Sequence, residues 1–325
     1  MKARVALIER HGGPEVIAWR SVELGAPGPG EALIRNKAVG LNFIDTYHRG
    51  GLYPLALPSG LGLEAASIVE AVGEGVANVA PGDRVATMGP PLGAYATARL
   101  YPAAALIQLP DDVSDETAAA VLLKGCTAEF LVERCARVES GWPVLVHAAA
   151  GATGLYLVQW LKHIGATVIG TVSNETKAAA AREAGADHVI IYTREDIAAR
   201  IRDITRGEGV RVVFDGVGMA TWDASLASCA RRGLIVSFGN ADAPVTGVNL
   251  GILAARGSLH VTRPTLFDYY RTSAEIAAGT ARLFELLREN VLKVHIGQRH
   301  PLEDAAGAHA ELEAGKTIGA TILVP

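Results

Sequence analysis

The first third of the chain alternates short apolar segments with turn sequences. The predicted strands are residues 4–9, 15–22, 31–39, 66–72, 83–88 and 94–99. Glycine and proline separate these segments, as in Pro27-Gly28-Pro29-Gly30, and such residues are typical of tight turns. The pattern predicts a small, irregular β-barrel or sandwich in which the loops carry the variable chemistry.

From Ser114 onward, helices and strands alternate. Ser114 is placed to cap an alanine-rich helix that runs toward Arg137. Further strands are predicted at residues 143–147, 167–171, 188–192, 210–215, 234–238 and 258–262. Further helices are predicted at residues 153–164, 175–184, 195–205 and 222–230. These strands are continuous apolar runs, typical of parallel strands covered on both faces, so the pattern predicts an α/β fold with a doubly wound sheet.

The C-terminal part does not extend this alternation. A long helix is predicted over residues 268–290, followed by a helix and a strand within 301–324. We therefore assign residues 1–122 and 266–325 to one β-rich domain, and residues 123–265 to a nucleotide-binding domain inserted into it. The length of 325 residues agrees with two domains of about 150 residues each.

Composition narrows the possible partners. The 30 Lys and Arg residues against 34 Asp and Glu give a net charge of −4, which argues against nucleic-acid binding through phosphate neutralisation. The apolar runs are too short to span a membrane, and charged residues in the first ten positions leave no signal-peptide core. The three cysteines make neither a disulfide framework nor a zinc cluster: Cys126, Cys135 and Cys229. We expect a reduced, soluble, cytoplasmic protein.

A glycine-containing turn follows the first strand of the alternating region. In the segment from Val144 to Gly154, Ala149 stands at the first position of the G-x-G-x-x-G pattern, and Gly151 and Gly154 stand at the other two. Small side chains let the backbone approach a pyrophosphate, and the following helix N-terminus offers N–H donors to it. Alone, the motif also fits an ordinary strand–helix turn, but its place in a repeated strand–helix pattern predicts dinucleotide binding.

The end of the second strand of this region indicates which dinucleotide is bound. NAD-specific sites place a carboxylate there, about 20 residues beyond the glycines. This chain instead has Ser173, with Lys177 one helical turn further on. A hydroxyl and an ammonium suit a 2′-phosphate, so we expect NADPH, although Glu175 lies between them and Lys177 also fits an ordinary solvated helix position.

Two positions where a catalytic zinc ligand would be sought hold other residues. Asn42 and Leu63 are not zinc ligands, and Cys126 as a lone thiol is more typical of a buried apolar residue. We therefore predict no metal. A quinone or a conjugated enone is already electrophilic and needs no Lewis acid, and Tyr47, Tyr53 and Asn42 are candidate polar contacts for its oxygen.

With these residues identified, the chain resembles the zeta-crystallin-like quinone oxidoreductases, a zinc-free family of the medium-chain dehydrogenases/reductases, and looks especially like its bacterial NADPH-dependent members. The matching motifs span nearly the whole chain: His11-Gly12-Gly13-Pro14-Glu15-Val16, residues 40–47, Gly51-Leu52-Tyr53-Pro54, residues 147–151, Arg231-Arg232-Gly233-Leu234, residues 236–240 and Val261-Thr262-Arg263-Pro264.

The resemblance implies a GroES-like catalytic domain, a Rossmann domain, a homodimer, and a quinone bound in the interdomain cleft next to the nicotinamide of NADPH. It implies roles at or near the catalytic centre for Asn42, Ile44, Tyr47, Tyr53 and Thr127. The remaining cofactor-binding residues that we expect are Gly151, Ala152, Thr153, Ser173, Lys177, Tyr192, Val217, Phe238, Gly239, Asn240, Thr262, Arg263 and Lys316.

The chain departs from the family pattern at a few positions. Ala152-Thr153 stands where Gly-Val is common, Leu63 where Thr is common, and Gly315 at a position that can hold Arg, so that Lys316 is expected to supply the charge.

Two other functions stay open from the sequence. One is an NADPH-dependent reductase of activated C=C bonds in enals or enones, because it needs the same cofactor and a similar apolar pocket. The other is a cofactor-binding protein with a non-catalytic task, such as RNA binding or a crystallin-like structural role, against which the acidic balance argues.

Overall fold

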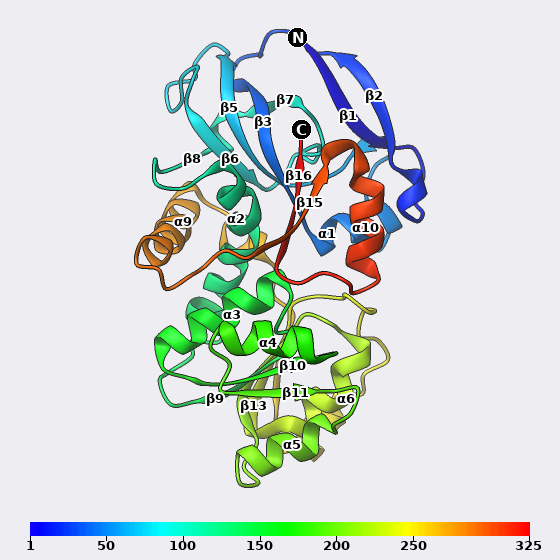
Figure 1. Cartoon of the computed structure of the whole chain (residues 1–325), viewed down its shortest axis with the longest axis vertical. Helices are drawn as coiled ribbons and strands as arrows, with labels where there is room; N and C mark the ends of the chain where they lie inside the picture. Colours follow the sequence, from blue (N-terminus) through cyan, green and yellow to red (C-terminus); the bar gives the residue numbers. More distant parts are fainter. The chain divides into compact units, whose positions relative to one another are not determined.

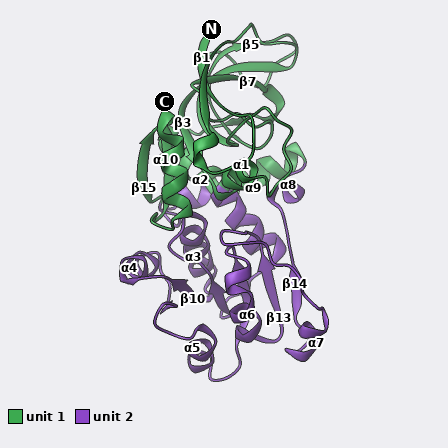
Figure 2. Ribbon diagram, turned by 90° about the vertical axis from the view of Figure 1, so that its right-hand side faces the viewer, with its two compact units in different colours: residues 1–123, 272–284, 294–325 green, residues 124–271, 285–293 purple.

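The computed structural model describes all 325 residues, and both chain termini lie in the first of two units, which share no sheet (Figure 1). Unit 1 comprises residues 1–123, 272–284 and 294–325, and unit 2 comprises residues 124–271 and 285–293 (Figure 2). Two helices cross the boundary between the units: α2 (Asp115–Glu129) and α9 (Ser273–Arg288).

Unit 1 is built from two sheets. Its three-stranded sheet has the order β2-β1-β4: β1 (Lys2–Ile8), β2 (Ala18–Glu23) and β4 (Ser59–Gly60). The seven-stranded sheet comprises β3 (Glu31–Leu41), β5 (Glu64–Val72), β6 (Arg84–Met88), β7 (Ala98–Pro102), β8 (Ile107–Gln108), β15 (Ile296–Pro301) and β16 (Ala320–Val324). Its order is β15-β16-β3-β5-β6-β8, with β7 also paired to β3.

Strand β3 organises unit 1 because it pairs antiparallel with β5, β7 and β16. Short helices complete the unit: the 3-10 turns η1 (Pro14–Val16), η2 (Ala103–Ala105) and η4 (Leu302–Asp304), and the helices α1 (Phe43–Gly50) and α10 (Ala305–Glu313). One apolar cluster joins Ile8, Val39 and Leu323 of the sheets to Ala305 and Ala308 of α10. The strand β3 thus leads from this core directly into the candidate residue Asn42.

Unit 2 has the predicted doubly wound parallel sheet, with the order β11-β10-β9-β12-β13-β14. Its strands are β9 (Pro143–Val146), β10 (Thr167–Val172), β11 (His188–Ile191), β12 (Val210–Asp215), β13 (Cys229–Ser237) and β14 (His260–Thr262). Numbered from β9, this is the order 3-2-1-4-5-6 of a Rossmann fold.

Helices surround this sheet: the π-helical segment η3 (Phe130–Cys135), α3 (Ala152–Ile164), α4 (Glu175–Glu183), α5 (Ile197–Ile204), α6 (Met219–Ser228), α7 (Gly251–Ala255) and α8 (Leu266–Tyr269). One core cluster packs Leu145 and Ile169 of the strands against Ile201 of α5 and Leu226 of α6. No helix of the structure is both long and apolar enough to cross a membrane.

Three predicted elements differ from the structure. The strand expected at 15–22 begins with the 3-10 turn η1, because Pro14 fixes its own φ and favours a turn start. The strand expected at 94–99 is β7, shifted to Ala98–Pro102. The single helix expected at 268–290 is two helices, because Thr272 caps α9: its hydroxyl accepts from Glu275 N–H at 3.2 Å, and the Glu275 carboxylate accepts from Thr272 N–H at 2.8 Å.

Candidate functional site

The turn between β9 and α3 is the most exposed part of the predicted dinucleotide motif. Gly151 is the N-cap of α3, with extended backbone angles, and residues 151–153 are all half-buried. The first N–H groups of a helix have no acceptor within the helix, so Ala152 and Thr153 offer donors at this end. Such donors, together with the positive end of the helix dipole, have the chemistry that suits a phosphate group.

Gly154 is required by the packing of α3 against the turn. A Cβ at this position would lie 2.3 Å from the Ala148 carbonyl oxygen and 2.9 Å from the Ala149 Cα. Ala148 itself has a positive φ of 51°, so the strand reverses sharply before the helix begins. The absence of a side chain at Gly154 therefore lets the helix N-terminus sit close to the end of β9, as the sequence motif predicts.

A buried hydrogen-bond network joins the ends of three neighbouring strands near this turn. His147, after β9, contacts Thr171 of β10 through Nδ1 at 2.9 Å and Ser225 through Nε2 at 3.1 Å. The Ser225 hydroxyl donates to Asp215 of β12 at 2.8 Å, so its oxygen accepts from His147 Nε2–H. Burial lowers the pKa of His147 and keeps the ring neutral, despite the opposing effect of the Asp215 charge.

The same Asp215 carboxylate shapes the loop that carries Val217. Its Oδ1 accepts from Val217 N–H at 2.9 Å, Gly218 N–H at 3.0 Å and Thr221 Oγ1 at 2.8 Å. Gly218 has a φ of +103°, and a Cβ there would lie 2.1 Å from Ala243 O. Sequence analysis did not identify Asp215 as a functional residue. Its position at the end of a buried strand, directly before Gly216, is a signal that indicates such a residue.

The end of β10 places the two residues predicted to bind a 2′-phosphate. Ser173 and Lys177 are both half-buried, and Asn174 between them caps α4 by accepting from Lys177 N–H at 3.0 Å. Burial lowers the pKa of the Lys177 ammonium below its usual value. An anion beside it would favour the charged form and oppose this desolvation.

Two arginine side chains balance the negative charge of Glu175, the carboxylate that would otherwise repel a 2′-phosphate. Its carboxylate accepts from Arg194 Nη2 at 2.5 Å, and its other oxygen lies 3.9 Å from Arg182 Nη1. Tyr192, two residues before Arg194, has an exposed fraction of 49%. Sequence analysis missed Arg194, since its position gives no signal until β11 is placed beside β10.

Two predicted residues, Asn240 after β13 and Arg263 after β14, contact each other in the structure. With its amide oriented to satisfy both neighbours, Asn240 accepts from Arg263 Nη2 at 3.1 Å and donates to Gly239 O at 3.0 Å. Phe238 packs beside Gly216, where a Cβ would lie 2.8 Å from the ring. A Cβ at Gly239 would collide with Gly216 O at 2.4 Å, so the two loops meet backbone to backbone. Thr262 ends the edge strand β14.

In unit 1, Asn42 is held at the point where β3 passes into α1. Its side-chain Nδ2 donates to Glu64 Oε2 at 2.9 Å, and its backbone N–H donates to Asp45 Oδ2 at 3.0 Å. Glu64 is fully buried, and its other oxygen accepts from Leu123 N–H at 2.7 Å. A Cβ at Gly40 would lie 2.2 Å from the Glu64 carboxylate, so a glycine is needed beside it. The sequence reading did not identify Glu64.

Tyr47 and Tyr53 belong to one aromatic cluster. Their ring centroids are 5.2 Å apart at an interplanar angle of 64°, and His48 lies 5.9 Å from Tyr53. Phe43 contributes a fourth ring, 6.3 Å from Tyr47. Tyr47 is nearly buried, whereas Tyr53 is half-buried. The cluster provides an apolar surface that carries two phenol groups.

The remaining predicted residues are more dispersed. Ile44 is half-buried in the first turn of α1, Thr127 is half-buried near the end of α2, and Lys316 is exposed after α10. The Lys316 backbone N–H donates to Glu311 O at 3.1 Å, at the end of α10. The assignment of Lys316 to the cofactor therefore still rests on the family resemblance.

The residues tested as zinc ligands do not form a metal site. No three His, Cys, Asp or Glu side chains come together in a way that could hold a metal ion. Leu63 and Cys126 are both buried, and all three cysteines are free thiols. A catalytic zinc needs three protein ligands, and this donor set does not fit one.

Two family models match the chain. The alcohol dehydrogenase GroES-like domain matches residues 28–111, and the zinc-binding dehydrogenase model matches residues 152–283. The second description names zinc, but no group of His, Cys, Asp or Glu side chains in this structure could hold a metal ion.

Individual relatives match over almost the whole chain. The quinone oxidoreductase of Pseudomonas aeruginosa is 49% identical over 97% of both chains. A 2-haloacrylate reductase from a Burkholderia species is 43% identical over 98% of both chains. The crystal structure of Escherichia coli quinone oxidoreductase complexed with NADPH superposes with a TM-score of 0.97 and 46% identity, covering 99% of this chain and 100% of that one.

Proposed function

Because the chain belongs to the quinone oxidoreductase family of the medium-chain dehydrogenases/reductases, we propose that it is an NADPH-dependent, zinc-independent quinone oxidoreductase. The observation that carries the proposal is the end of β10. There, a hydroxyl from Ser173 and a half-buried ammonium from Lys177 occupy the place of an NAD-specific carboxylate, and the one nearby acid is paired with Arg194.

The residues of unit 2 fit a bound NADPH. The glycine contacts at Gly154 and Gly239 keep two backbone segments free of side chains, and the α3 N-terminus offers donors to a pyrophosphate. We assign Gly151, Ala152 and Thr153 to the pyrophosphate. To the 2′-phosphate and its ribose we assign Ser173, Lys177 and Tyr192. To the rest of the cofactor we assign Val217, Phe238, Gly239, Asn240, Thr262 and Arg263, with Lys316 as an additional cation.

The residues of unit 1, together with Thr127, are assigned to the nicotinamide end and the substrate. When bound, NADPH supplies a hydride to an acceptor that is already electrophilic. Asn42 orients the reacting groups with an amide held by Glu64, and Ile44 and Thr127 line the nicotinamide or its ribose. The phenols of Tyr47 and Tyr53 donate hydrogen bonds to the quinone oxygen, where negative charge develops. No step requires a metal ligand from the chain.

The direct test is oxidation of NADPH by purified protein with benzoquinones and naphthoquinones, followed at the absorbance of the reduced nicotinamide. We expect turnover well above the uncatalysed rate, unchanged after treatment with a chelator, and much weaker turnover with NADH. Absence of turnover with every quinone, or a stoichiometric metal found by elemental analysis, would contradict the proposal.

A second candidate function is reduction of activated C=C bonds, favoured by the 43% identical relative that is named a 2-haloacrylate reductase. It requires the same bound cofactor and the same apolar, phenol-bearing cluster. Turnover of a quinone and of an α,β-unsaturated ketone at equal concentration separates the two, and we expect the quinone to be reduced faster.

We further propose that the protein acts as a homodimer in the cytoplasm. The edge strand β14 leaves one side of the parallel sheet unpaired, and Val261 on it is 39% exposed, which is the geometry for pairing with a second copy. Three free cysteines suit a reducing compartment. Light scattering coupled to size exclusion measures the mass directly, and a monomer at micromolar concentration would contradict the dimer.

A further inference from the structure

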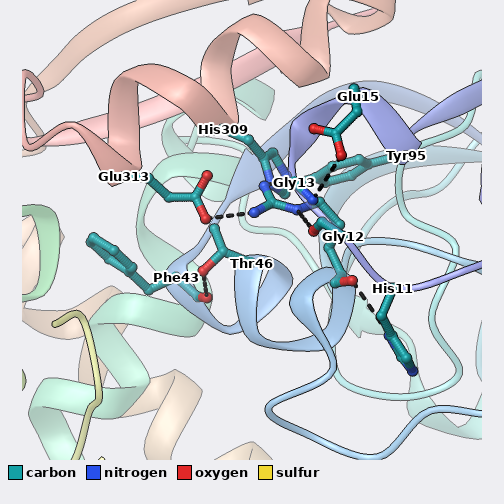
Figure 3. Close-up of polar contacts among 10 residues, drawn as sticks. His11, Gly12, Gly13, Glu15, Phe43, Thr46, Tyr95, His309 and Glu313 are labelled. Atoms are coloured by element: carbon teal, nitrogen blue, oxygen red, sulfur yellow. Dashed lines mark hydrogen bonds and ion pairs between the residues drawn. The ribbon is translucent and has the colours of Figure 1, made fainter. Parts of the chain in front are cut away.

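A chain of buried hydrogen bonds in unit 1 connects α10 to the first turn of α1. It runs from Arg49 through His309 and Tyr95 to Asp45. Figure 3 shows the His309 ring beside Tyr95, and a dashed line marks the contact of the Glu313 carboxylate at the start of this path. We propose that His309, acting through Tyr95 and Asp45, is a positioning residue that fixes the start of α1 for the reaction. The inference rests on the proposed function insofar as it assigns Asn42 to the nicotinamide.

Each contact of the chain has hydrogen-bond geometry. Tyr95 OH donates to Asp45 Oδ2 at 2.9 Å and lies 2.9 Å from His309 Nε2. On the other side of the ring, Arg49 Nη1 lies 2.8 Å from His309 Nδ1. The Tyr95, His309 and Asp45 side chains are completely buried, so no water competes for these partners.

All hydrogen bonds of this hydrogen-bond chain are donated in one direction, from Arg49 toward Asp45. The guanidinium of Arg49 can only donate, so His309 Nδ1 accepts from it, and the proton of the neutral ring is on Nε2. Nε2–H then donates to the Tyr95 oxygen, whose single hydrogen goes to Asp45. Burial, reinforced by the Arg49 charge, lowers the pKa of His309 to about 3, so the ring is neutral at physiological pH.

Arg49 is anchored at both ends of its guanidinium. Its Nη2 pairs with Glu313 of α10 at 2.5 Å, and its Nε donates to Gly12 O at 3.0 Å. The Arg49 side chain is 4% exposed, whereas that of Glu313 is 37% exposed. The hydrogen-bond chain therefore begins at the carboxylate of Glu313, on the surface, and ends at the buried carboxylate of Asp45.

Asp45 connects the hydrogen-bond chain to the backbone of Asn42. The oxygen that accepts from Tyr95 OH, Oδ2, also accepts from the Asn42 backbone N–H at 3.0 Å. The Asn42 side chain is held separately by Glu64. Asn42 is thus fixed at its backbone through α10 and at its side chain through β5, which restricts the direction of its amide.

The first experiment compares His309→Ala with His309→Gln. A glutamine amide offers one donor and one acceptor with a spacing close to that of the two imidazole nitrogens, so it can replace the neutral ring. We expect His309→Ala to lower kcat for quinone reduction roughly 10- to 100-fold, with the NADPH dissociation constant little changed. His309→Gln should recover most of that loss.

The second experiment removes one hydroxyl and has a matched control. Tyr95→Phe interrupts the hydrogen-bond chain, whereas Tyr101→Phe deletes the hydroxyl of another buried tyrosine of unit 1, which donates to Gly89 O and Pro90 O. We expect Tyr95→Phe to lower kcat and Tyr101→Phe to leave it unchanged. Because only one atom is lost, Tyr95→Phe keeps the test informative if His309→Ala does not fold.

A readout without substrate separates this inference from the proposed function. Hydrogen exchange of the backbone amides at residues 42–46 should accelerate in His309→Ala and in Tyr95→Phe, but not in Tyr101→Phe. If the wild-type protein reduces no quinone, the proposed function fails while exchange still tests the positioning role. Equal kcat in His309→Gln and His309→Ala, or equal effects of the two tyrosine variants, would overturn the inference.

Discussion

Among single residues, Glu175 has a direct bearing on which nicotinamide cofactor the chain accepts. In the sequence, a carboxylate two residues after Ser173 opposes a 2′-phosphate. In the structure this carboxylate is paired with Arg194 at 2.5 Å and lies 3.9 Å from Arg182. Its charge is therefore balanced by Arg194 from the turn after β11 and by Arg182 further along α4, and Lys177 remains the half-buried cation at the start of α4.

Lys177→Ala should weaken NADPH binding much more than NADH binding. The ammonium forms a charge-assisted contact only with the phosphate that distinguishes the two cofactors, and losing such a contact costs roughly tenfold in affinity. Fluorescence titration of both reduced cofactors measures the effect, and Lys177→Arg, which keeps the positive charge, is the control. Equal losses for both cofactors would refute the assignment of Lys177 to the phosphate.

At the scale of elements, the β9–α3 turn shows local sequence and packing in agreement. The small residues of the motif place α3 close to the strand, and the first residue of the helix, Ala152, is the one at which family members commonly have glycine. The backbone still forms the helix start, because Gly151 and Gly154 occupy the positions with the close backbone contacts.

Gly154→Ala should damage this element. The added methyl group would lie 2.3 Å from the Ala148 carbonyl oxygen, which is backbone and cannot rotate away, so α3 must shift. We expect a loss of about 1–3 kcal/mol in the free energy of unfolding and weaker NADPH binding. Denaturant unfolding and cofactor titration measure both effects. Gly25→Ala is the control, because no atom lies within 4 Å of a Cβ there; similar losses in both variants would contradict the packing argument.

Element boundaries were harder to predict than element types. The break between α8 and α9 depends on Thr272 and Glu275, a capping pair that the sequence contains but that an apolar pattern continuing over residues 268–290 obscures. The parallel strands of unit 2 were easier to place, since each is a continuous apolar run bounded by turn residues.

At the scale of the whole molecule, each unit contains a buried, neutral histidine. His147 lies in unit 2 and His309 in unit 1, and burial lowers the pKa of both. In the unfolded chain these groups take up a proton near pH 6.5, the ordinary pKa of histidine, whereas burial in the folded chain lowers the pKa of His309 to about 3. Stability from these groups is thus fully present above pH 6.5 and is lost progressively as the pH falls.

Lowering the pH from 7 to 5 should therefore destabilise the wild-type protein. The His309 shift contributes about 2 kcal/mol to that loss, since each pH unit below 6.5 costs about 1.4 kcal/mol. Urea unfolding at the two pH values measures the change. His309→Gln has no titrating ring and should show a correspondingly smaller loss; the same pH dependence in both proteins would contradict the argument.

The sequence by itself determined the fold class, the two-part organisation and the dinucleotide motif. These depend on local properties: the periodicity of apolar residues, turn residues, and the small side chains of one strand–helix turn. The identity of residues at separate positions, such as Ser173 in place of an acid, was also readable without coordinates.

Only the tertiary structure decided which buried polar groups meet. Tyr95 lies 50 residues from Asp45 and 214 residues from His309 in the chain, yet the three share consecutive hydrogen bonds. Arg194 reaches Glu175 in the same way, from the turn that follows β11. Such partners are chosen by how strands and helices pack, because a buried donor or acceptor must find a partner in three dimensions and the linear sequence does not record the distance between them.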